Sequence, residues 1–106
     1  MKTYLRFGRI KKVKIKWTKG AQNNLNQIEE YIAVDNPKAA VDTVIKIIKI
    51  VGMLSDNPAM GRTGRIFGTR ELIISGTPFI VPYRIKSEQI EILRVLHGSK
   101  KWLNSI

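Results

Sequence analysis

The sequence predicts an α+β domain in which a helical hairpin packs on one face of an antiparallel sheet. Apolar residues recur at helical spacing through residues 21–54, and after residue 70 they alternate or cluster as in strands. Turn-forming residues separate these segments. The expected order is strand, helix, helix, strand, strand, strand. A chain of 106 residues can build one compact core and leaves no room for a second domain of ordinary size.

The first strand and the two helices follow from local patterns. Residues 13–17 alternate apolar and charged side chains, which is typical of a half-buried strand. Thr18 is the candidate N-cap of a helix whose apolar positions recur every three or four residues as far as Ile32. Pro37 suits the first position of a second helix, whose apolar stripe ends at Leu54. The connection is so short that the two helices must form an antiparallel hairpin.

The C-terminal half is expected to form a three-stranded meander. Residues 59–68 hold three glycines and are interpreted as a loop. Strands are predicted over residues 70–74, 79–85 and 90–97, with turns at 75–78 and 86–89. The last strand is almost continuously apolar, which suggests a central position covered on both faces. Pro82 cannot donate a ladder hydrogen bond, so a bulge or an unpaired edge is expected there.

The charge is strongly basic and unevenly placed. The chain has 19 Lys and Arg against 8 Asp and Glu, a net charge of +11. Residues 1–20 carry eight basic residues and no acid, residues 21–60 are close to neutral, and residues 61–106 carry eight basic residues and three acids. A polyanion or an acidic protein is the expected partner. We expect a basic N-terminal arm over residues 1–12 and a single domain over residues 13–106.

Several classes of protein and site are excluded by composition. The absence of cysteine excludes disulfides, thiolate zinc sites and thiol nucleophiles, and the single histidine limits a histidine metal site to one such ligand. No apolar run reaches the length of a membrane helix or a signal peptide, so a cytoplasmic protein without membrane association is expected. Glu71, Glu88 and Glu91 form no close acidic pair and are expected to be solvated surface charges. No metal or cofactor is predicted.

A set of cationic side chains forms the candidate site. Arg62 and Arg65 lie in the glycine-containing loop, where exposed guanidinium groups can bind phosphate or carboxylate with two hydrogen bonds. Arg84 and Arg94 interrupt apolar strands, which costs stability unless each is paired or hydrated. The structural alternative is that these two arginines pair with the strand glutamates or extend to solvent at an edge.

Metal-free RNA cleavage is chemically conceivable with these residues. It needs groups that transfer protons and cations that surround the phosphate. His97 is the only side chain that titrates near neutral pH unaided, and Tyr83 could assist it. A lone histidine at a strand end is more often structural. If the protein is a ribonuclease, the candidate catalytic residues are Arg65, Tyr83, Arg84, Arg94 and His97.

The stretches that carry a family resemblance are Trp17-Thr18-Lys19-Gly20-Ala21, Gly68-Thr69-Arg70-Glu71-Leu72, Phe79-Ile80-Val81-Pro82-Tyr83-Arg84, and Ile92-Leu93-Arg94-Val95-Leu96-His97-Gly98 followed by Trp102. Together and in this order, over roughly residues 13–103, the chain resembles the RelE/ParE superfamily of bacterial type II toxins, also called plasmid-stabilisation proteins. The resemblance implies two helices packed on an antiparallel sheet. It also implies a cognate antitoxin, usually encoded beside the toxin, that wraps and neutralises it.

The family divides by target. Its RelE branch cleaves mRNA on the ribosome, and its ParE branch poisons DNA gyrase. RelE-like nucleases resemble one another in carrying a basic residue in the strand before the tyrosine-like position, with a further basic residue and a Tyr or His near the C-terminus. Here residues 80–82 before Tyr83 are apolar and no tyrosine follows Gly98, although His97 and Lys100 could substitute in part. The Pro-Tyr-Arg strand and the Arg-Val-Leu-His-Gly ending resemble ParE-type members.

The resemblance therefore favours a ParE-like gyrase inhibitor that acts by protein contact and is not itself an enzyme. The expected target-binding residues are Arg62, Arg65, Arg70, Lys100, Lys101 and Trp102. The alternative is a ribosome-dependent mRNA interferase, that is, a metal-independent endoribonuclease. A further alternative is a degenerate antitoxin-binding module without toxicity.

Overall fold

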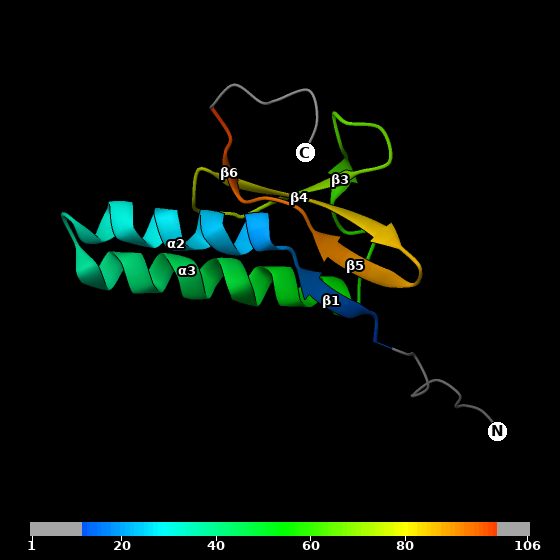
Figure 1. The fold of residues 1–106 in the computed structure, drawn as a ribbon, viewed down its shortest axis with the longest axis horizontal. Helices are drawn as coiled ribbons and strands as arrows, with labels where there is room; N and C mark the ends of the chain where they lie inside the picture. Colours follow the sequence, from blue (N-terminus) through cyan, green and yellow to red (C-terminus); the bar gives the residue numbers. More distant parts are fainter. Residues whose placement is uncertain (1–11, 100–106) are drawn as a thin grey trace.

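The computed structural model describes residues 12–99 and confirms the expected α+β architecture (Figure 1). Two long helices lie side by side on one face of a mixed sheet. Of the predicted N-terminal arm, only Lys12 falls within the described residues. The elements in chain order are β1 (Lys14–Trp17), α2 (Lys19–Ala33), α3 (Pro37–Gly52), the 3-10 turn η2 (Met53–Ser55), β2 (Arg62–Thr63), β3 (Arg70–Ile73), β4 (Phe79–Lys86), β5 (Gln89–Ile92) and β6 (Leu96–His97).

Both predicted helix starts are confirmed. The Thr18 hydroxyl accepts a hydrogen bond from the Ala21 N–H at 3.2 Å and donates to the Ile92 carbonyl at 2.7 Å, so one cap also ties α2 to the end of β5. Asn36 caps α3 by the same kind of bond, and Pro37 occupies the first helical position. No helix within residues 12–99 has both the length and the apolar character needed to cross a bilayer.

The strands are arranged in the order β1-β5-β4-β3-β2. Strands β3, β4 and β5 form the predicted antiparallel meander, and β1 joins it in parallel beside β5. Strand β5 is covered on one face only, where Ile90 and Ile92 are buried; Gln89 and Glu91 are half-buried on the other face. The expected cover on both faces was wrong, because both helices lie on the same side of the sheet.

The predicted strand 90–97 is broken into β5 and β6 by a β-bulge. Between the two paired segments, β4 contributes two residues and the opposite chain contributes three. Leu93 donates its N–H to the Pro82 carbonyl at 2.9 Å, and Val95 donates its N–H to the side chain of Asn24 at 2.9 Å. The irregularity expected at Pro82 is therefore confirmed as a bulge, and α2 satisfies the backbone that leaves the ladder.

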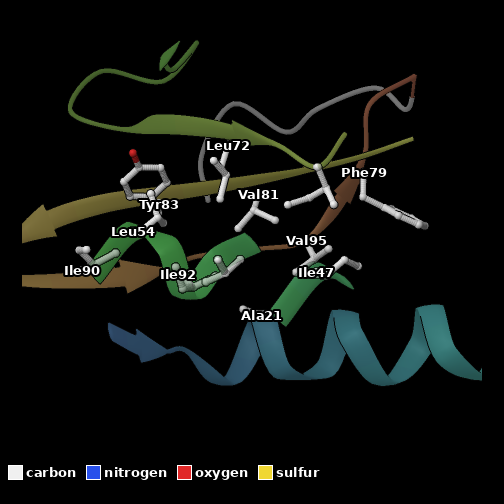
Figure 2. Close-up of a cluster of buried hydrophobic side chains, with 12 residues drawn as sticks. Ala21, Ile47, Leu54, Leu72, Phe79, Val81, Tyr83, Ile90, Ile92 and Val95 are labelled. Carbon is white, nitrogen blue, oxygen red and sulfur yellow. The ribbon is translucent and has the colours of Figure 1, made fainter. Parts of the chain in front are cut away.

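One hydrophobic core lies between the sheet and the helices (Figure 2). Ile47 and Val51 of α3 and Leu54 of η2 pack against inward-facing residues of β3, β4 and β5. Ala21 is the buried contact of α2, where the first helical turn crosses beneath the end of β5. This packing fixes one face of the sheet and leaves the polar residues of the strands on the other face.

Candidate functional site

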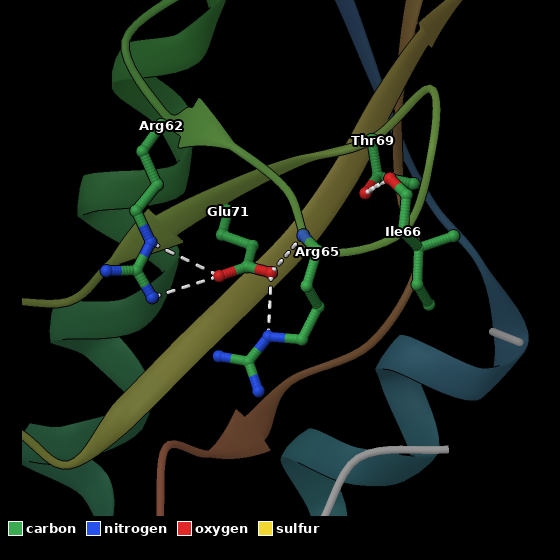
Figure 3. A network of polar contacts seen from close by, with 5 residues as sticks. All are labelled: Arg62, Arg65, Ile66, Thr69 and Glu71. Carbon is green, nitrogen blue, oxygen red and sulfur yellow. Dashed lines mark hydrogen bonds and ion pairs between the residues drawn. The ribbon is translucent and has the colours of Figure 1, made fainter. Parts of the chain in front are cut away.

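Glu71 organises the glycine-containing loop that precedes β3. Its carboxylate accepts hydrogen bonds from Arg62 Nε and Nη2 at 3.2 and 3.0 Å on one oxygen, and from Arg65 N and Nε at 2.9 and 3.1 Å on the other (Figure 3). Thr69 closes the same loop by donating from its hydroxyl to the Ile66 carbonyl at 2.6 Å. Because Glu71 is 2% exposed, the loop is held by an internal ionic clamp.

The expectation that Glu71 is a solvated surface charge was wrong. Burial alone would raise the pKa of Glu71, but the donors of Arg65 and Arg62 outweigh it and hold the pKa below its ordinary value. The side chains of Arg62 and Arg65 remain 51% and 44% exposed on their outer sides. These two arginines therefore have a structural role, while part of each guanidinium group still faces solvent.

The prediction that residues 59–68 form only a loop was wrong. Residues 62–63 form strand β2, which pairs with Arg70 and Glu71 of β3. Arg70 Nη1 donates to the Gly61 carbonyl at 2.7 Å, and the Tyr83 hydroxyl donates to the Pro58 carbonyl at 2.7 Å and accepts from the Gly61 N–H at 2.9 Å. Burial raises the pKa of Tyr83, although the Gly61 bond and Arg70 oppose this. Tyr83 is fully buried, and its hydroxyl anchors the turn over residues 58–61 to β4.

Arg84 pairs with Glu91 across β4 and β5, with 2.7 Å between Arg84 Nε and Glu91 Oε1. This hydrogen bond lowers the pKa of Glu91, and Lys86 and Lys16 add attraction. The structural alternative is thus confirmed for Arg84. The pair lies on the face of the sheet away from the helices, where the register places Lys16 of β1 next to Glu91.

Three of the predicted cations line a single hollow, which we name the arginine pocket. Its volume is about 590 Å³, and Phe67 stands beside it with its side chain fully exposed. The pocket is lined by Thr63, Gly64, Arg65, Phe67, Gly68, Thr69, Arg70, Arg84 and Ile85. A cationic hollow with an exposed aromatic ring can bind an acidic surface or a phosphate and pack an apolar group beside it.

Arg94 and His97 lie apart from the arginine pocket. Arg94 donates from Nη1 to the Leu93 carbonyl at 2.9 Å, and a methyl group at Gly20 would overlap its guanidinium group. His97 stacks edge-on against Phe79, with 5.8 Å between ring centroids. His97 pairs with Phe79 at one end of β4, and at the usual rise of a strand this is about 17 Å from the Arg84 position.

The predicted site is therefore brought together only in part. Arg65, Arg70 and Arg84 meet at the pocket, with Arg62 on the same clamp, whereas Arg94, His97 and the buried Tyr83 do not converge with them. Lys100, Lys101 and Trp102 lie outside the described residues. Among residues 12–99, no three His, Asp or Glu side chains converge as a metal site would require.

Sequence reasoning missed Phe67 and Ile85 as pocket residues. Phe67 lies between Ile66 and Gly68 in the glycine-containing loop, and an aromatic ring at such a position was a usable signal, because it gains nothing if the loop leaves it in solvent. Ile85 carried no distinguishing signal, since it continues the apolar pattern of its strand. Its exposure is shared by the other residues at this end of β4, where Arg84 and Lys86 are exposed as well.

Comparison with known proteins identifies the family. The sequence model of the family described as the ParE toxin of the type II toxin–antitoxin system parDE matches residues 15–102 of this chain. The chain belongs to the ParE toxin family. It is 45% identical over 89 residues to the Sinorhizobium fredii protein Y4kP, which is named as a candidate toxin; the match covers 84% of this chain and 92% of the relative.

Two solved toxin–antitoxin structures share this fold. A chain of the chromosomal ParDE system of P. aeruginosa superposes with a TM-score of 0.74 and 32% identity, covering 80% of this chain and 95% of that one. A chain of the RelBE2 toxin–antitoxin complex of Mycobacterium tuberculosis superposes with a TM-score of 0.59 and 25% identity, covering 81% and 98%. The chain is thus a ParE-like member of the RelE/ParE superfamily, the toxin class of type II toxin–antitoxin systems.

Proposed function

We propose that this ParE-family toxin inhibits DNA gyrase in the cytoplasm by protein–protein contact, and that a cognate antitoxin neutralises it. The contact surface is the arginine pocket together with the exposed Phe67 ring. The outer sides of Arg65 and Arg84 would meet acidic groups of the target. Arg62 of β2 and Arg70 of β3 would contribute beside them, and Lys100, Lys101 and Trp102 remain predicted contacts.

The observation that carries this proposal is the separation of the cations from the proton-transfer candidates. His97 is the single histidine of the chain and lies at the opposite end of β4 from Arg84. The Tyr83 hydroxyl is buried with two backbone partners, so it has no path to a substrate in the pocket. Within residues 12–99 the pocket thus brings cations together without His97 or the Tyr83 hydroxyl, and a surface of this kind suits an inhibitor better than a nuclease.

The second candidate function is a ribosome-dependent mRNA interferase, and the arginine pocket supports it too. Arg65 and Arg84 could hold a phosphate, and the Phe67 ring could stack on a base. In that case Arg94 and His97 would have to reach the phosphate, which requires that the segment carrying them moves on binding the ribosome. The degenerate antitoxin-binding module remains the third candidate.

These candidates are separated by inducing the protein in growing bacteria that lack the antitoxin. Gyrase inhibition predicts that a DNA-damage reporter rises while long transcripts stay intact. Interferase action predicts prompt cleavage of mRNA and arrest of translation. Unchanged growth at a confirmed level of folded protein would contradict both activities and leave the degenerate module.

The role of the pocket is tested with Phe67→Ala, because this side chain is fully exposed and its removal should therefore leave the fold intact. We expect toxicity to fall at least tenfold, since a central aromatic contact of an interface commonly contributes about 1.4 kcal/mol or more. The matched control is Tyr31→Ala, which removes an aromatic ring that is 82% exposed on α2. Equal effects of the two variants would contradict a contact at the pocket.

A further inference from the structure

Four cations occupy one corner of the sheet, on the face away from the helices. Lys14 and Lys16 belong to β1, and Arg84 and Lys86 belong to the end of β4. All four residues are exposed, and we name them the cationic corner. The strands that carry it lie at the opposite end of the molecule from the turn that joins α2 to α3 (Figure 1).

The register of the strands arranges the cationic corner in two rows across β5. Lys14 and Lys86 are both partners of Gln89, and the other two members of the corner are both partners of Glu91. Side chains of residues paired in register point to the same face of a sheet. The backbone positions of the two cations in a row are therefore about 10 Å apart, and the rows are about 7 Å apart along the strands.

These spacings suit the phosphates of duplex DNA. One strand of the duplex carries a phosphate for about every 3.4 Å of helix axis, so every second phosphate advances about 7 Å. The two strands are separated by grooves about 6 and 12 Å wide. Successive rows can therefore follow one strand of DNA, and the two cations of a row can contact phosphates on both sides of a groove.

Glu91 reports a positive potential at the centre of the cationic corner. It accepts a hydrogen bond from Arg84 Nε at 2.7 Å, which lowers the pKa of Glu91, and Lys86 and Lys16 lower that pKa further by Coulomb attraction. Glu88 is the other acid of the β4–β5 hairpin and lies in its turn. The four cations outnumber these two acids, so the corner attracts a polyanion.

The hairpin that carries half of the corner has a tight turn. Ser87 and Glu88 form this two-residue turn with positive φ values of 53° and 60°. Turns of this kind match the twist of paired strands, although their left-handed backbone favours glycine or asparagine. Lys86 and Gln89 therefore stay paired at the last position of the ladder. A surface that is already ordered loses little conformational entropy when it binds a rigid duplex.

The composition of the two rows favours a duplex over a single strand. Proteins that bind single strands combine cations with aromatic rings that stack on the bases. The two rows contain lysine, arginine, glutamine and glutamate, and no aromatic residue. A duplex keeps its bases inside and presents phosphates at regular spacing, which long cationic side chains can contact. This regular spacing also matches the rows better than the irregular charge of an acidic protein.

We propose that the cationic corner binds the phosphate backbone of duplex DNA without reading its sequence. Its four side chains contact phosphates, and the amide of Gln89 donates a further hydrogen bond to a phosphate oxygen. Arg84 also lines the arginine pocket, so the two surfaces adjoin. The inference deepens the proposed function and rests on it, because a toxin that contacts gyrase at the pocket would meet the DNA that gyrase holds at the corner.

The test is the binding of a labelled duplex of about 20 base pairs to the full chain without gyrase, measured by fluorescence anisotropy between about 50 and 200 mM salt. The logarithm of the association constant falls linearly with the logarithm of the salt concentration. Replacing Lys14 and Lys16 together with glutamine should reduce the steepness of this line by about 1.8, because each phosphate contact contributes about 0.9. At about 0.1 M salt, the same change should weaken binding by more than roughly tenfold.

The matched control is Lys46→Gln with Lys49→Gln, which removes the same charge from two exposed residues of α3. Its slope should stay close to that of the original protein, because α3 lies on the other face of the sheet. Glu91→Gln should act in the opposite sense, since it frees Arg84 for a phosphate and steepens the line by about 0.9. Glu30→Gln on α2 is its control, and thermal unfolding shows that each variant is folded.

A corner that takes no part in DNA binding would give equal slopes for the two lysine double variants, and this would overturn the inference. Absence of duplex binding at the lowest salt would overturn it as well. So would displacement of the duplex by an equal concentration of charge on single-stranded RNA or polyglutamate, since a single strand or an acidic protein would then be the partner.

Failure of this inference is distinguishable from failure of the proposed function. If the duplex does not bind but induction of the protein still raises the DNA-damage reporter, the inference is wrong and gyrase inhibition stands. If the duplex binds with the expected slopes and the reporter does not rise, the corner is confirmed as a DNA-binding surface and gyrase inhibition fails.

Discussion

Replacing Glu71 with glutamine tests whether the ionic clamp holds the glycine-containing loop that lines the arginine pocket. The amide has nearly the same shape as the carboxylate, but only one of its terminal atoms can accept hydrogen bonds. The donors of either Arg62 or Arg65 therefore lose their acceptor. Hydrogen bonds to a charged group contribute about 1.5–3 kcal/mol. Because each guanidinium group is about half exposed and can rehydrate, we expect a loss of about 2 kcal/mol.

Urea unfolding is monitored by circular dichroism, and thermal unfolding gives the midpoint temperature Tm as a second measurement. A loss of about 2 kcal/mol corresponds to a decrease of roughly 8 °C in Tm for a domain of this size. The control is Glu91→Gln, which removes a carboxylate that also pairs with an arginine but lies on the solvent-facing side of the sheet. Its effect should be much smaller. A Glu71→Gln protein as stable as the original, or no less stable than Glu91→Gln, would refute the clamp.

Three further predictions concern Glu71, Tyr83 and Arg94. Because folding lowers the pKa of Glu71, the carboxylate contributes fully to stability above its ordinary pKa of 4.5, and this contribution is lost as the pH falls through the folded-state pKa. Urea unfolding at several pH values should therefore show that the difference in unfolding free energy between Glu71→Gln and the original protein disappears in that range. Tyr83→Phe leaves an N–H and a C=O of the 58–61 turn without their partner and should cost about 1–3 kcal/mol in urea unfolding; an unchanged midpoint would contradict that anchor. Gly20→Ala should displace the flexible end of Arg94 with little loss of stability, and unchanged toxicity would then exclude a role for the observed Arg94 position.

The helical hairpin and the meander were predictable because local rules determine them. Thr18 and Pro37 mark helix starts through caps and dihedral limits that act within a few residues. Pro82 marks a bulge because the missing N–H is a property of the residue itself. In each case the sequence neighbourhood contains the physical cause.

The remaining features depend on partners distant in the sequence. The parallel pairing of β1 with β5 joins segments that no turn connects, so no local pattern reports it. The break after Ile92 is stabilised by Asn24 from α2, whose side chain has an ordinary place in a helical pattern. The burial of Glu71 was missed because its charge suggested solvent, whereas two arginines before it in the chain made a buried carboxylate stable.

The arginine pocket shows the same limit for the site. Each arginine was identified as a candidate because charge is visible in the sequence. Which of these arginines lie together could not be predicted, because Arg65, Arg70 and Arg84 become neighbours only in the folded chain. The role of Phe67 depends on an exposure that the composition does not state.

The proposed function, in which this protein binds gyrase and does not cut RNA, can be tested directly. The most direct measurement combines the purified chain with DNA gyrase and plasmid, and in parallel with ribosomes translating a defined message. We expect gyrase-dependent DNA cleavage to accumulate, to weaken with Phe67→Ala and to persist with Tyr31→Ala, while the message stays whole. Cleavage of the ribosome-bound message with gyrase unaffected would contradict the account.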